Sequence, residues 1–171
     1  MRKTHAAIGS TAFFIAAPGT VTVLIPWLIT RWEGREPLPD ALSWATPVLQ
    51  TVGIALILAG GAVVINAFVR FVMDGLGTPA PVAPPEHLVV TGLYRHVRNP
   101  MYVGVISVII GEALLLGRYE LLVYAAIAFA VMYGFVRVYE EPKLRSLFGH
   151  EYETYRAAVP GWRPRLHPWR P

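Results

Sequence analysis

The chain has 171 residues, of which 54% are apolar and only 15% are charged, whereas soluble domains average roughly 25% charged residues. The charges lie between long apolar runs, which excludes an ordinary soluble domain and indicates an integral membrane protein. The net charge of +4 comes mainly from residues beside the apolar runs and near the C-terminus, which favours anionic lipid headgroups over nucleic acid as partners. The absence of cysteine excludes disulfides, thiolate nucleophiles and cysteine metal sites.

Four apolar runs predict an all-α, polytopic membrane protein, because about 20 apolar residues suffice to cross the hydrocarbon core. The predicted spans are residues 6–30, 45–72, 101–116 and 121–139. A cleaved signal peptide is the alternative for the first run, which follows Arg2 and Lys3. A retained helix is favoured because apolar residues continue well beyond Ala17. We therefore expect one membrane domain over residues 1–171.

The second run contains glycines that let another helix or a ligand approach its backbone, namely Gly53, Gly60 and Gly61. A homodimer that buries these glycine faces is one option. Asn66 and Arg70, near the end of the run, either reach a polar cavity or serve helix packing and the membrane interface.

The last two runs are joined only by Gly117, Arg118 and Tyr119, which predicts an antiparallel C-terminal helical hairpin. Of the 15 Lys and Arg residues, only Arg31, Arg35 and Arg118 fall on the two loops opposite the termini. The positive-inside rule then places both termini on the cytoplasmic side of a plasma or inner membrane. Residues 73–100 and 140–171 are expected to lie on that side as well.

Two cytoplasmic segments flank this hairpin. Before it, Gly75–Pro85 is rich in Pro and Gly and predicts an extended loop, laid over a site or serving as a plain connector. The apolar piece from Glu86 to Val90 is strand-like. After the hairpin, Pro142 suits the start of a new amphipathic helix and Gly149 suits its end. A further short helix would carry Tyr152 and Tyr155; the alternative is a basic tail lying on the membrane.

Polar residues gather at the two cytoplasmic ends of the hairpin. Those before its first helix are Tyr94, Arg98, Asn99 and Tyr102, and those at the end of its second helix are Arg137, Glu140 and Glu141. Because the two helices run antiparallel, both groups should lie side by side. The sequence therefore predicts one polar site at the membrane border.

The residue types in this site favour an organic cofactor over a metal. Glu140 and Glu141 offer fewer oxygens than Mg²⁺ or Ca²⁺ usually needs, and no His pair has zinc spacing. A carboxylate can bind ribose hydroxyls, and tyrosine rings attract a sulfonium by about 0.5 to 2 kcal/mol. The mixture suits S-adenosylmethionine, and no metal site is predicted.

Several motifs in fixed order resemble those of the isoprenylcysteine carboxyl methyltransferase and phospholipid methyltransferase superfamily. They are Gly92-Leu93-Tyr94, the run Arg98-Asn99-Pro100-Met101-Tyr102-Val103-Gly104, Glu140-Glu141 with Leu144, Phe148-Gly149, and Glu151-Tyr152 with Thr154-Tyr155. The resemblance covers roughly Gly75 to Pro164. It implies a membrane-embedded methyltransferase that binds S-adenosylmethionine.

The resemblance also assigns roles to individual residues. Cofactor contacts are implied for His87, Leu88, Val89, Tyr94, Asn99, Pro100, Tyr102 and Glu140. Arg137 best matches a basic residue near the substrate, one residue out of register. Many family members have His where this chain has Asn99, and Asn cannot titrate near neutral pH.

The implied reaction is direct displacement of a methyl group from sulfonium by a nucleophile held in line. A carboxylate acceptor needs no base, whereas an amine would need one, for which His96 and Glu141 are the nearby candidates. Arg98 or Arg137 could pair with an acidic acceptor. The catalytic residues expected are thus Arg137, Glu141 and Arg98, with O-methylation favoured over N- or S-methylation.

The acceptor itself remains open among lipophilic, membrane-resident molecules such as an isoprenylcysteine carboxylate, another lipid or an isoprenoid. Two other functions are open as well. A sterol-type membrane reductase would use NADPH, but its 2′-phosphate calls for more Arg and Lys near the ribose than a Glu pair allows. A non-catalytic protein that binds lipid would tolerate substitution of Glu140 and Tyr94.

Overall fold

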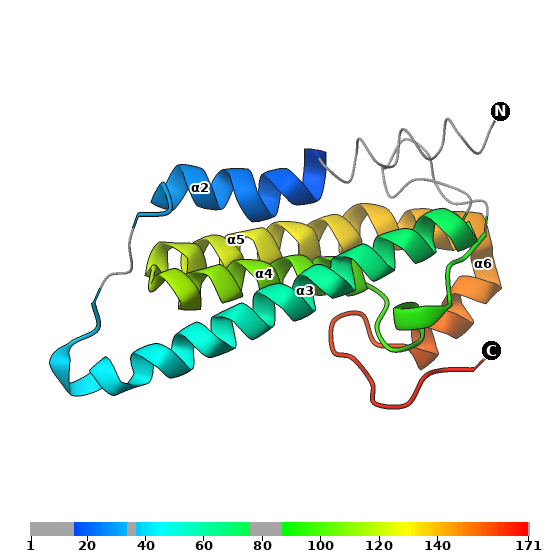
Figure 1. The fold of residues 1–171 in the computed structure, drawn as a ribbon. Helices are drawn as coiled ribbons and strands as arrows, with labels where there is room; N and C mark the ends of the chain where they lie inside the picture. The colour runs from blue at the N-terminus through cyan, green and yellow to red at the C-terminus, as the bar shows by residue number, and fades with distance from the viewer. Residues whose placement is uncertain (1–15, 34–36, 76–86, 171) are drawn as a thin grey trace.

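The computed structural model describes residues 16–33, 37–75 and 87–170, and these ranges contain helices and loops but no strand. The helices run lengthwise through an elongated bundle (Figure 1). The α2–α3 connection and the α4–α5 turn lie at one end of the bundle. The segment before α4, the helix α6 and the C-terminal tail meet at the other end.

The helices follow the predicted apolar runs. Their bounds are η1 Thr20–Leu24 and α2 Ile25–Thr30, η2 Asp40–Ala45 and α3 Thr46–Gly75, η3 Gly92–Arg95, α4 Pro100–Leu116, and α5 Tyr119–Phe135, η4 Val136–Glu140 and α6 Glu141–Ala158. Of these, η1 and η4 are π-helical turns, and η2 and η3 are 3₁₀ turns.

Two helices are long and apolar enough to cross a membrane, Asp40–Arg70 and Tyr119–Ala158. The apolar helices Ala16–Thr30 and Pro100–Leu116 are shorter. An all-helical fold is therefore confirmed for the described residues, whereas the number of four spans stays a prediction. The first part of the predicted span 6–30 and the loop 76–86 lie outside the described residues.

The predicted antiparallel hairpin of α4 and α5 has clear local causes. Pro100 begins α4, where its missing N–H costs nothing and its fixed φ suits the helix. Gly117 ends α4 in the left-handed conformation at φ 63°, which a residue without Cβ adopts without strain. Glu120 then lies in the first turn of α5, where a negative charge complements the helix dipole.

Glycines bring α3 and α4 into backbone contact. A Cβ on Gly53 would lie 2.6 Å from the Gly111 carbonyl oxygen, and a Cβ on Gly60 would lie 2.7 Å from that of Gly104. Gly53 and Gly60 are thus buried inside this chain, whereas a Cβ on Gly61 would meet nothing within 4 Å. A dimer itself stays a prediction.

The bundle core lies between the same helices and α5. Its buried residues are Val64, Val105, Ile109, Ala125 and Ala128. The N-terminal helix joins them through Tyr124, whose hydroxyl donates a hydrogen bond to the Val21 carbonyl at 2.9 Å.

Two local expectations differ from the structure. His87 to Val90 form no strand, since no partner strand is present in the described ranges to pair with them. The helix starting near Pro142 is not separate but continues α5 through η4. Gly149 breaks the helical path at φ 49° and ψ −121°, so the predicted stop there is a kink, after which Tyr152 and Tyr155 are buried.

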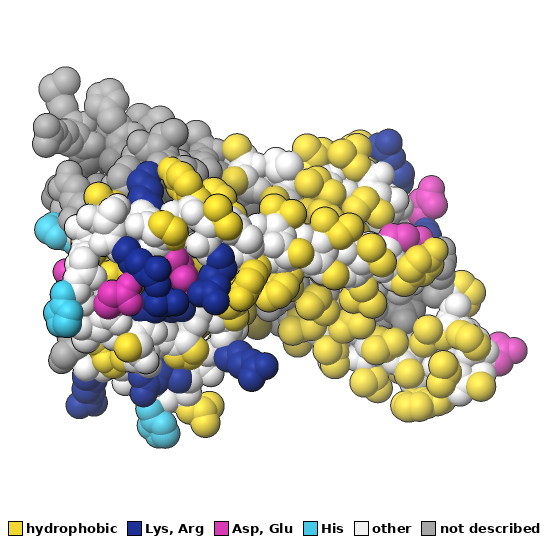
Figure 2. Space-filling model, turned by 180° about the vertical axis from the view of Figure 1, so that it is seen from behind, with side chains coloured by type: hydrophobic (Ala, Val, Ile, Leu, Met, Phe, Trp, Pro, Cys, Tyr) yellow, Lys and Arg dark blue, Asp and Glu magenta, His cyan; other side chains and the backbone are white. Residues whose placement is uncertain are grey.

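Apolar and charged side chains occupy different parts of the surface (Figure 2). Leu58 and Val131 are 69% and 66% exposed although both lie in the middle of apolar helices. Charged residues gather mainly at the end that carries α6 and the tail. Exposed apolar middles with a polar end are typical of a bundle whose solvent is lipid.

Candidate cofactor site

The end of the hairpin brings together the two polar groups of the sequence. Tyr102, in the first turn of α4, donates a hydrogen bond from its hydroxyl to Glu140 Oε1 at 2.6 Å. Arg98, just before α4, donates from Nη1 to Glu141 Oε1 at 2.9 Å. Antiparallel packing makes these residues neighbours, although some forty residues separate them along the chain.

Glu140 is a half-buried carboxylate with one tyrosine partner. Burial raises its pKa above the ordinary range, and the hydrogen bond from Tyr102 offsets this only in part. The Glu140 charge also acts on Tyr94, whose phenol pKa is raised first by burial and then by this carboxylate. Glu140, Tyr94 and Tyr102 therefore form one electrostatic unit.

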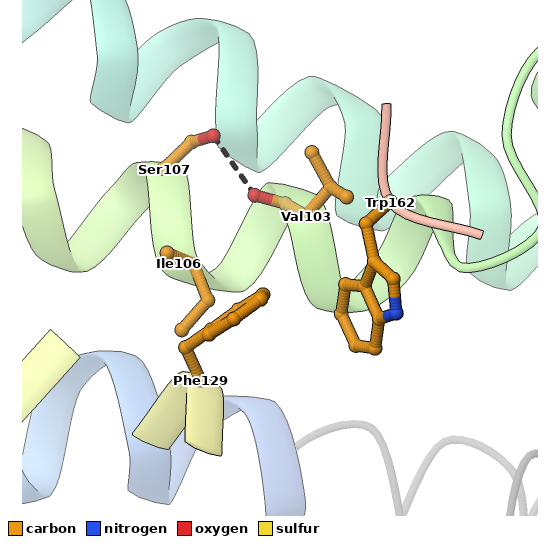
Figure 3. Close-up of a pocket in the computed structure, with 5 residues that line it drawn as sticks. All are labelled: Val103, Ile106, Ser107, Phe129 and Trp162. Atoms are coloured by element: carbon orange, nitrogen blue, oxygen red, sulfur yellow. Dashed lines mark hydrogen bonds between the residues drawn. The ribbon is translucent and has the colours of Figure 1, made fainter. Parts of the chain in front are cut away.

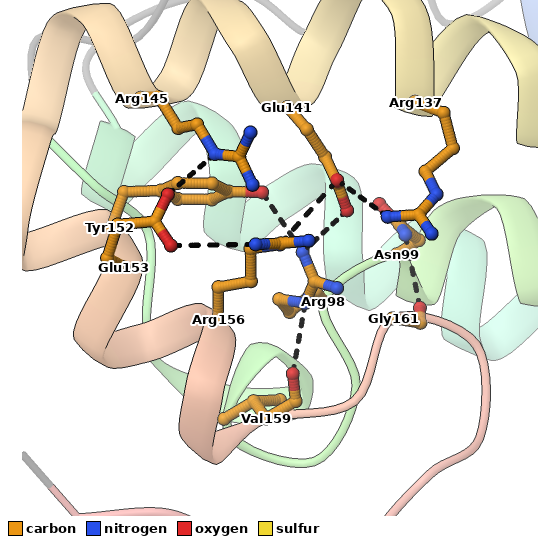
Figure 4. Close-up of polar contacts among 10 residues, drawn as sticks. All are labelled: Arg98, Asn99, Arg137, Glu141, Arg145, Tyr152, Glu153, Arg156, Val159 and Gly161. Carbon is orange, nitrogen blue, oxygen red and sulfur yellow. Dashed lines mark hydrogen bonds and ion pairs between the residues drawn. The ribbon is translucent and has the colours of Figure 1, made fainter.

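Glu141 lies instead among three arginines (Figure 4). Besides Arg98, Arg137 donates from Nη1 to Oε2 at 3.2 Å, and Arg156 Nε lies 3.6 Å from Oε2. The Glu141 side chain is only 7% exposed. Burial raises its pKa, but the hydrogen bonds from Arg98 and Arg137 outweigh burial and hold the pKa below the ordinary range. This carboxylate is better suited to orient arginines than to accept a proton.

The tail closes the site along the segment before α4. The Arg98 N–H donates to the Pro160 carbonyl at 2.9 Å, and the Asn99 N–H and its Nδ2 donate to the Gly161 carbonyl at 3.2 and 3.1 Å. The His96 and Arg95 carbonyls also accept hydrogen bonds from backbone N–H groups farther along the tail, and the Arg95 side chain donates one to a carbonyl there. The tail is therefore fixed to the protein along this segment, and its contact with a membrane stays a prediction.

An apolar opening of about 180 Å³ adjoins the polar site (Figure 3). Its walls come from α4, α5 and the tail, and they are Val103, Ile106, Ser107, Phe129 and Trp162. The one hydroxyl among them belongs to Ser107 and donates to the Val103 carbonyl at 2.8 Å. The opening is thus suited to an apolar group.

Aromatic rings connect this opening with the polar residues. The Trp162 ring lies 6.2 Å from that of Tyr102 and 5.7 Å from that of Tyr133, centroid to centroid. The Arg137 guanidinium lies over the Tyr133 ring at 5.7 Å, within the range of a cation–π contact. The apolar wall of the opening, the aromatic rings and the Arg137 guanidinium are therefore in contact with one another in that order.

A model of the phospholipid methyltransferase family matches residues 48–151, more than half of the chain. The chain belongs to this family. The protein-S-isoprenylcysteine O-methyltransferase of Schizosaccharomyces pombe is 35% identical over 82 residues, covering 47% of this chain and 35% of that protein. The alignment therefore spans about a third of the relative's length. No solved structure matches the chain.

Family membership confirms the resemblance inferred from the motifs, and the structure places most of the assigned residues near one another. Tyr94, Asn99, Tyr102 and Glu140 lie around one end of the hairpin. Pro100 is fully buried as the first residue of α4. Arg98, Arg137 and Glu141 form the adjoining charged cluster.

Three residues for which the resemblance implies cofactor contacts have other surroundings in the structure. His87 is exposed. Leu88 packs against the cluster of Tyr152, Tyr155 and Val159, and Val89 is buried with Ala67 and Tyr94. The side chains of Leu88 and Val89 serve packing around the site, and a cofactor role for all three residues stays a prediction.

Trp162 and Tyr152 have roles at the site that the sequence does not predict. The sequence places Tyr152 on a short helix and in a family motif but assigns it no contact, whereas in the structure its hydroxyl accepts a hydrogen bond from Arg98 at 3.0 Å. Trp162 belongs to a proline-rich tail without helical periodicity, so no pattern places it. The one available signal is a large aromatic side chain within an otherwise basic segment.

Proposed function

We propose that this chain is an integral membrane methyltransferase that uses S-adenosylmethionine and methylates the oxygen of a lipophilic, membrane-resident acceptor. The observation that carries the proposal is the half-buried Tyr102–Glu140 pair beside an apolar opening, in a member of the phospholipid methyltransferase family. The active site and both termini would lie on the cytoplasmic side of the membrane.

The residues present fit the cofactor in their chemistry. Glu140 can accept hydrogen bonds from ribose hydroxyls or an amino group, and Tyr94 and Tyr102 provide aromatic surface beside that carboxylate. Bound S-adenosylmethionine would supply an electrophilic methyl group on a sulfonium. The rings of Tyr102 and Trp162 offer faces that attract such a positive charge.

The acceptor would be oriented by the neighbouring residues. An apolar chain can enter the opening beside Phe129, while a carboxylate at its head can pair with Arg137. Glu141 holds the Arg137 guanidinium in place from the other side. A carboxylate acceptor is already ionised at neutral pH and needs no base. Orientation of the two reactants, which can supply about 7 to 11 kcal/mol of the barrier, would then provide most of the catalysis.

The first test is calorimetric binding of S-adenosylhomocysteine to the detergent-purified protein. Hydrogen bonds to charged groups contribute about 1.5 to 3 kcal/mol, so Glu140→Gln should weaken binding at least about tenfold. Glu120→Gln, the same change at the opposite end of the bundle, should leave binding unchanged. NADPH binding without S-adenosylhomocysteine binding would overturn the proposal in favour of a reductase, and binding of neither ligand in favour of a non-catalytic protein.

The acceptor atom is tested with radiolabelled S-adenosylmethionine and N-acetyl-S-farnesylcysteine as the probe. O-methylation forms an ester, so base should release the label as volatile methanol. The amide nitrogen and thioether sulfur of this probe are poor nucleophiles, so absence of label in a protein that binds S-adenosylhomocysteine would contradict methylation of a carboxylate oxygen.

A further inference from the structure

Trp162 lies where the apolar opening meets the polar site. Its ring packs edge-on against Phe129 at 5.1 Å and faces Tyr102 at 6.2 Å. Phe129 lines the opening, and Tyr102 bonds Glu140. One side chain therefore forms a wall of the opening (Figure 3) and also packs against Tyr102 of the polar site.

The backbone before Trp162 is held by the segment that precedes α4. The Gly161 carbonyl accepts both the Asn99 N–H and the Asn99 Nδ2–H bonds, and the Val159 carbonyl accepts a bond from Arg98 Nε at 3.0 Å. A Cβ on Gly161 would lie only 3.1 Å from Arg98 Nη2. These contacts fix the residue before Trp162 on both sides (Figure 4).

We propose that Trp162 determines which acceptor chains the enzyme takes, and that Asn99 is the positioning residue that holds it. This inference rests on the proposed function. With Trp162 in place the opening measures about 180 Å³, below the roughly 300 to 1,000 Å³ of ordinary ligand pockets. It admits only part of a long apolar chain, and the indole sets how far that part reaches toward the site.

Removal of the indole tests the specificity role. Initial rates are compared for N-acetyl-S-farnesylcysteine and the shorter N-acetyl-S-geranylcysteine. Trp162→Ala should shift the kcat/KM ratio about tenfold toward the farnesyl compound, a change typical of small volume differences in apolar pockets. Asn99→Ala should shift the ratio in the same direction, and Trp162→Phe should shift it less. The matched control is Trp44→Ala, because Trp44 is 71% exposed and lies in η2, away from the tail that carries Trp162.

Binding of S-adenosylhomocysteine to the same variants separates specificity from a cofactor role. Affinity within about twofold of the parent, with a shifted ratio, supports the proposal. An unshifted ratio in folded Trp162→Ala would overturn it. A large loss of S-adenosylhomocysteine affinity in Asn99→Ala, with no change in ratio, would instead assign Asn99 to the cofactor.

A readout without turnover keeps the inference separate from the proposed function. The chain has no cysteine, so Ser107→Cys places a single thiol in the opening. N-acetyl-S-farnesylcysteine should slow thiol labelling of Ser107→Cys several-fold but leave Ser146→Cys, on the exposed side of α6, unaffected. Equal labelling rates with and without the probe would overturn the inference, whereas absent S-adenosylhomocysteine binding with intact protection would overturn only the proposed function.

Discussion

Glu140 and Glu141 are consecutive residues with different surroundings. Glu140 ends the π-helical turn η4 and bonds Tyr102, whereas Glu141 begins α6 and faces three arginines. Successive residues of a helix point in different directions, so the two carboxylates do not act as a pair. One bonds a tyrosine of the proposed cofactor site, and the other holds the charged cluster together.

The charged cluster should make stability depend on pH. Because the folded pKa of Glu141 is lowered, its contribution is fully present above the ordinary carboxyl range and is lost as pH falls through the folded pKa. Breaking a buried pair costs about 3 to 5 kcal/mol, so Glu141→Gln should melt well below the parent at neutral pH.

The melting-temperature gap between the parent and Glu141→Gln should close as the detergent-solubilised proteins are taken to acidic pH. Glu153→Gln is the control, since its side chain is 46% exposed and its ion pairs contribute little. A gap that stays constant down to acidic pH would show that the Glu141 charge is not what stabilises the fold.

The charge pairing at this site could be predicted, but the aromatic wall could not. The antiparallel hairpin alone requires that Tyr102 and Arg98 lie near Glu140 and Glu141. Trp162 is placed by hydrogen bonds between Asn99 and the Gly161 carbonyl. Backbone hydrogen bonds between two irregular segments leave no periodic pattern in a sequence, so the sequence of the tail does not predict them.

At the scale of the elements, the glycines decide how α3 and α4 pack. Gly60 faces the Gly104 carbonyl, whereas a Cβ on its neighbour Gly61 would meet nothing within 4 Å. Gly60→Ala should therefore push the helices apart and lower the free energy of unfolding by about 1 to 3 kcal/mol. Gly61→Ala should be neutral or stabilising, because Ala favours helix over Gly by about 1 kcal/mol.

This pair of variants is compared by thermal unfolding in detergent and by S-adenosylhomocysteine binding. Equal melting temperatures for Gly60→Ala and Gly61→Ala would contradict the close α3–α4 contact. The sequence marks both glycines alike, since only the rotation of α3 against α4 distinguishes them.

The continuity of α5 with α6 cannot be predicted from the sequence either. Pro142 predicts a new helix, because proline cannot donate a backbone hydrogen bond and clashes with the carbonyl four residues earlier. The structure places the wider turn η4 directly before it, and a π-turn changes that bonding pattern locally. The helix therefore passes the proline without ending.

At the scale of the whole molecule, the arrangement of ends predicts a membrane topology. The turn around Arg118 and the α2–α3 connection share one end, as the contact of 3.5 Å between Arg118 Nη2 and Glu33 Oε2 confirms. The proposed site and the tail share the other end. From the positive-inside rule we expect the second end to lie on the cytoplasmic side.

Single cysteines test this orientation, since the chain has none of its own. In sealed cells, a membrane-impermeant maleimide should label Ser43→Cys in η2 and should spare Ser146→Cys in α6 until the membrane is permeabilised. Both positions are exposed, so accessibility in the protein is matched. Labelling of both, or of Ser146→Cys alone, would contradict the proposed topology.

The unbroken course of α5 through η4 into α6 has a mechanical consequence. Val131, exposed along the apolar part, and Glu140 belong to one rigid rod with no loop between them. A helix adapts to a thinner or thicker bilayer mainly by tilting. Tilt of this helix would move Glu140 relative to Tyr102, which lies on a different helix. We therefore expect lipid chain length to change the geometry of the proposed methyl-transfer site.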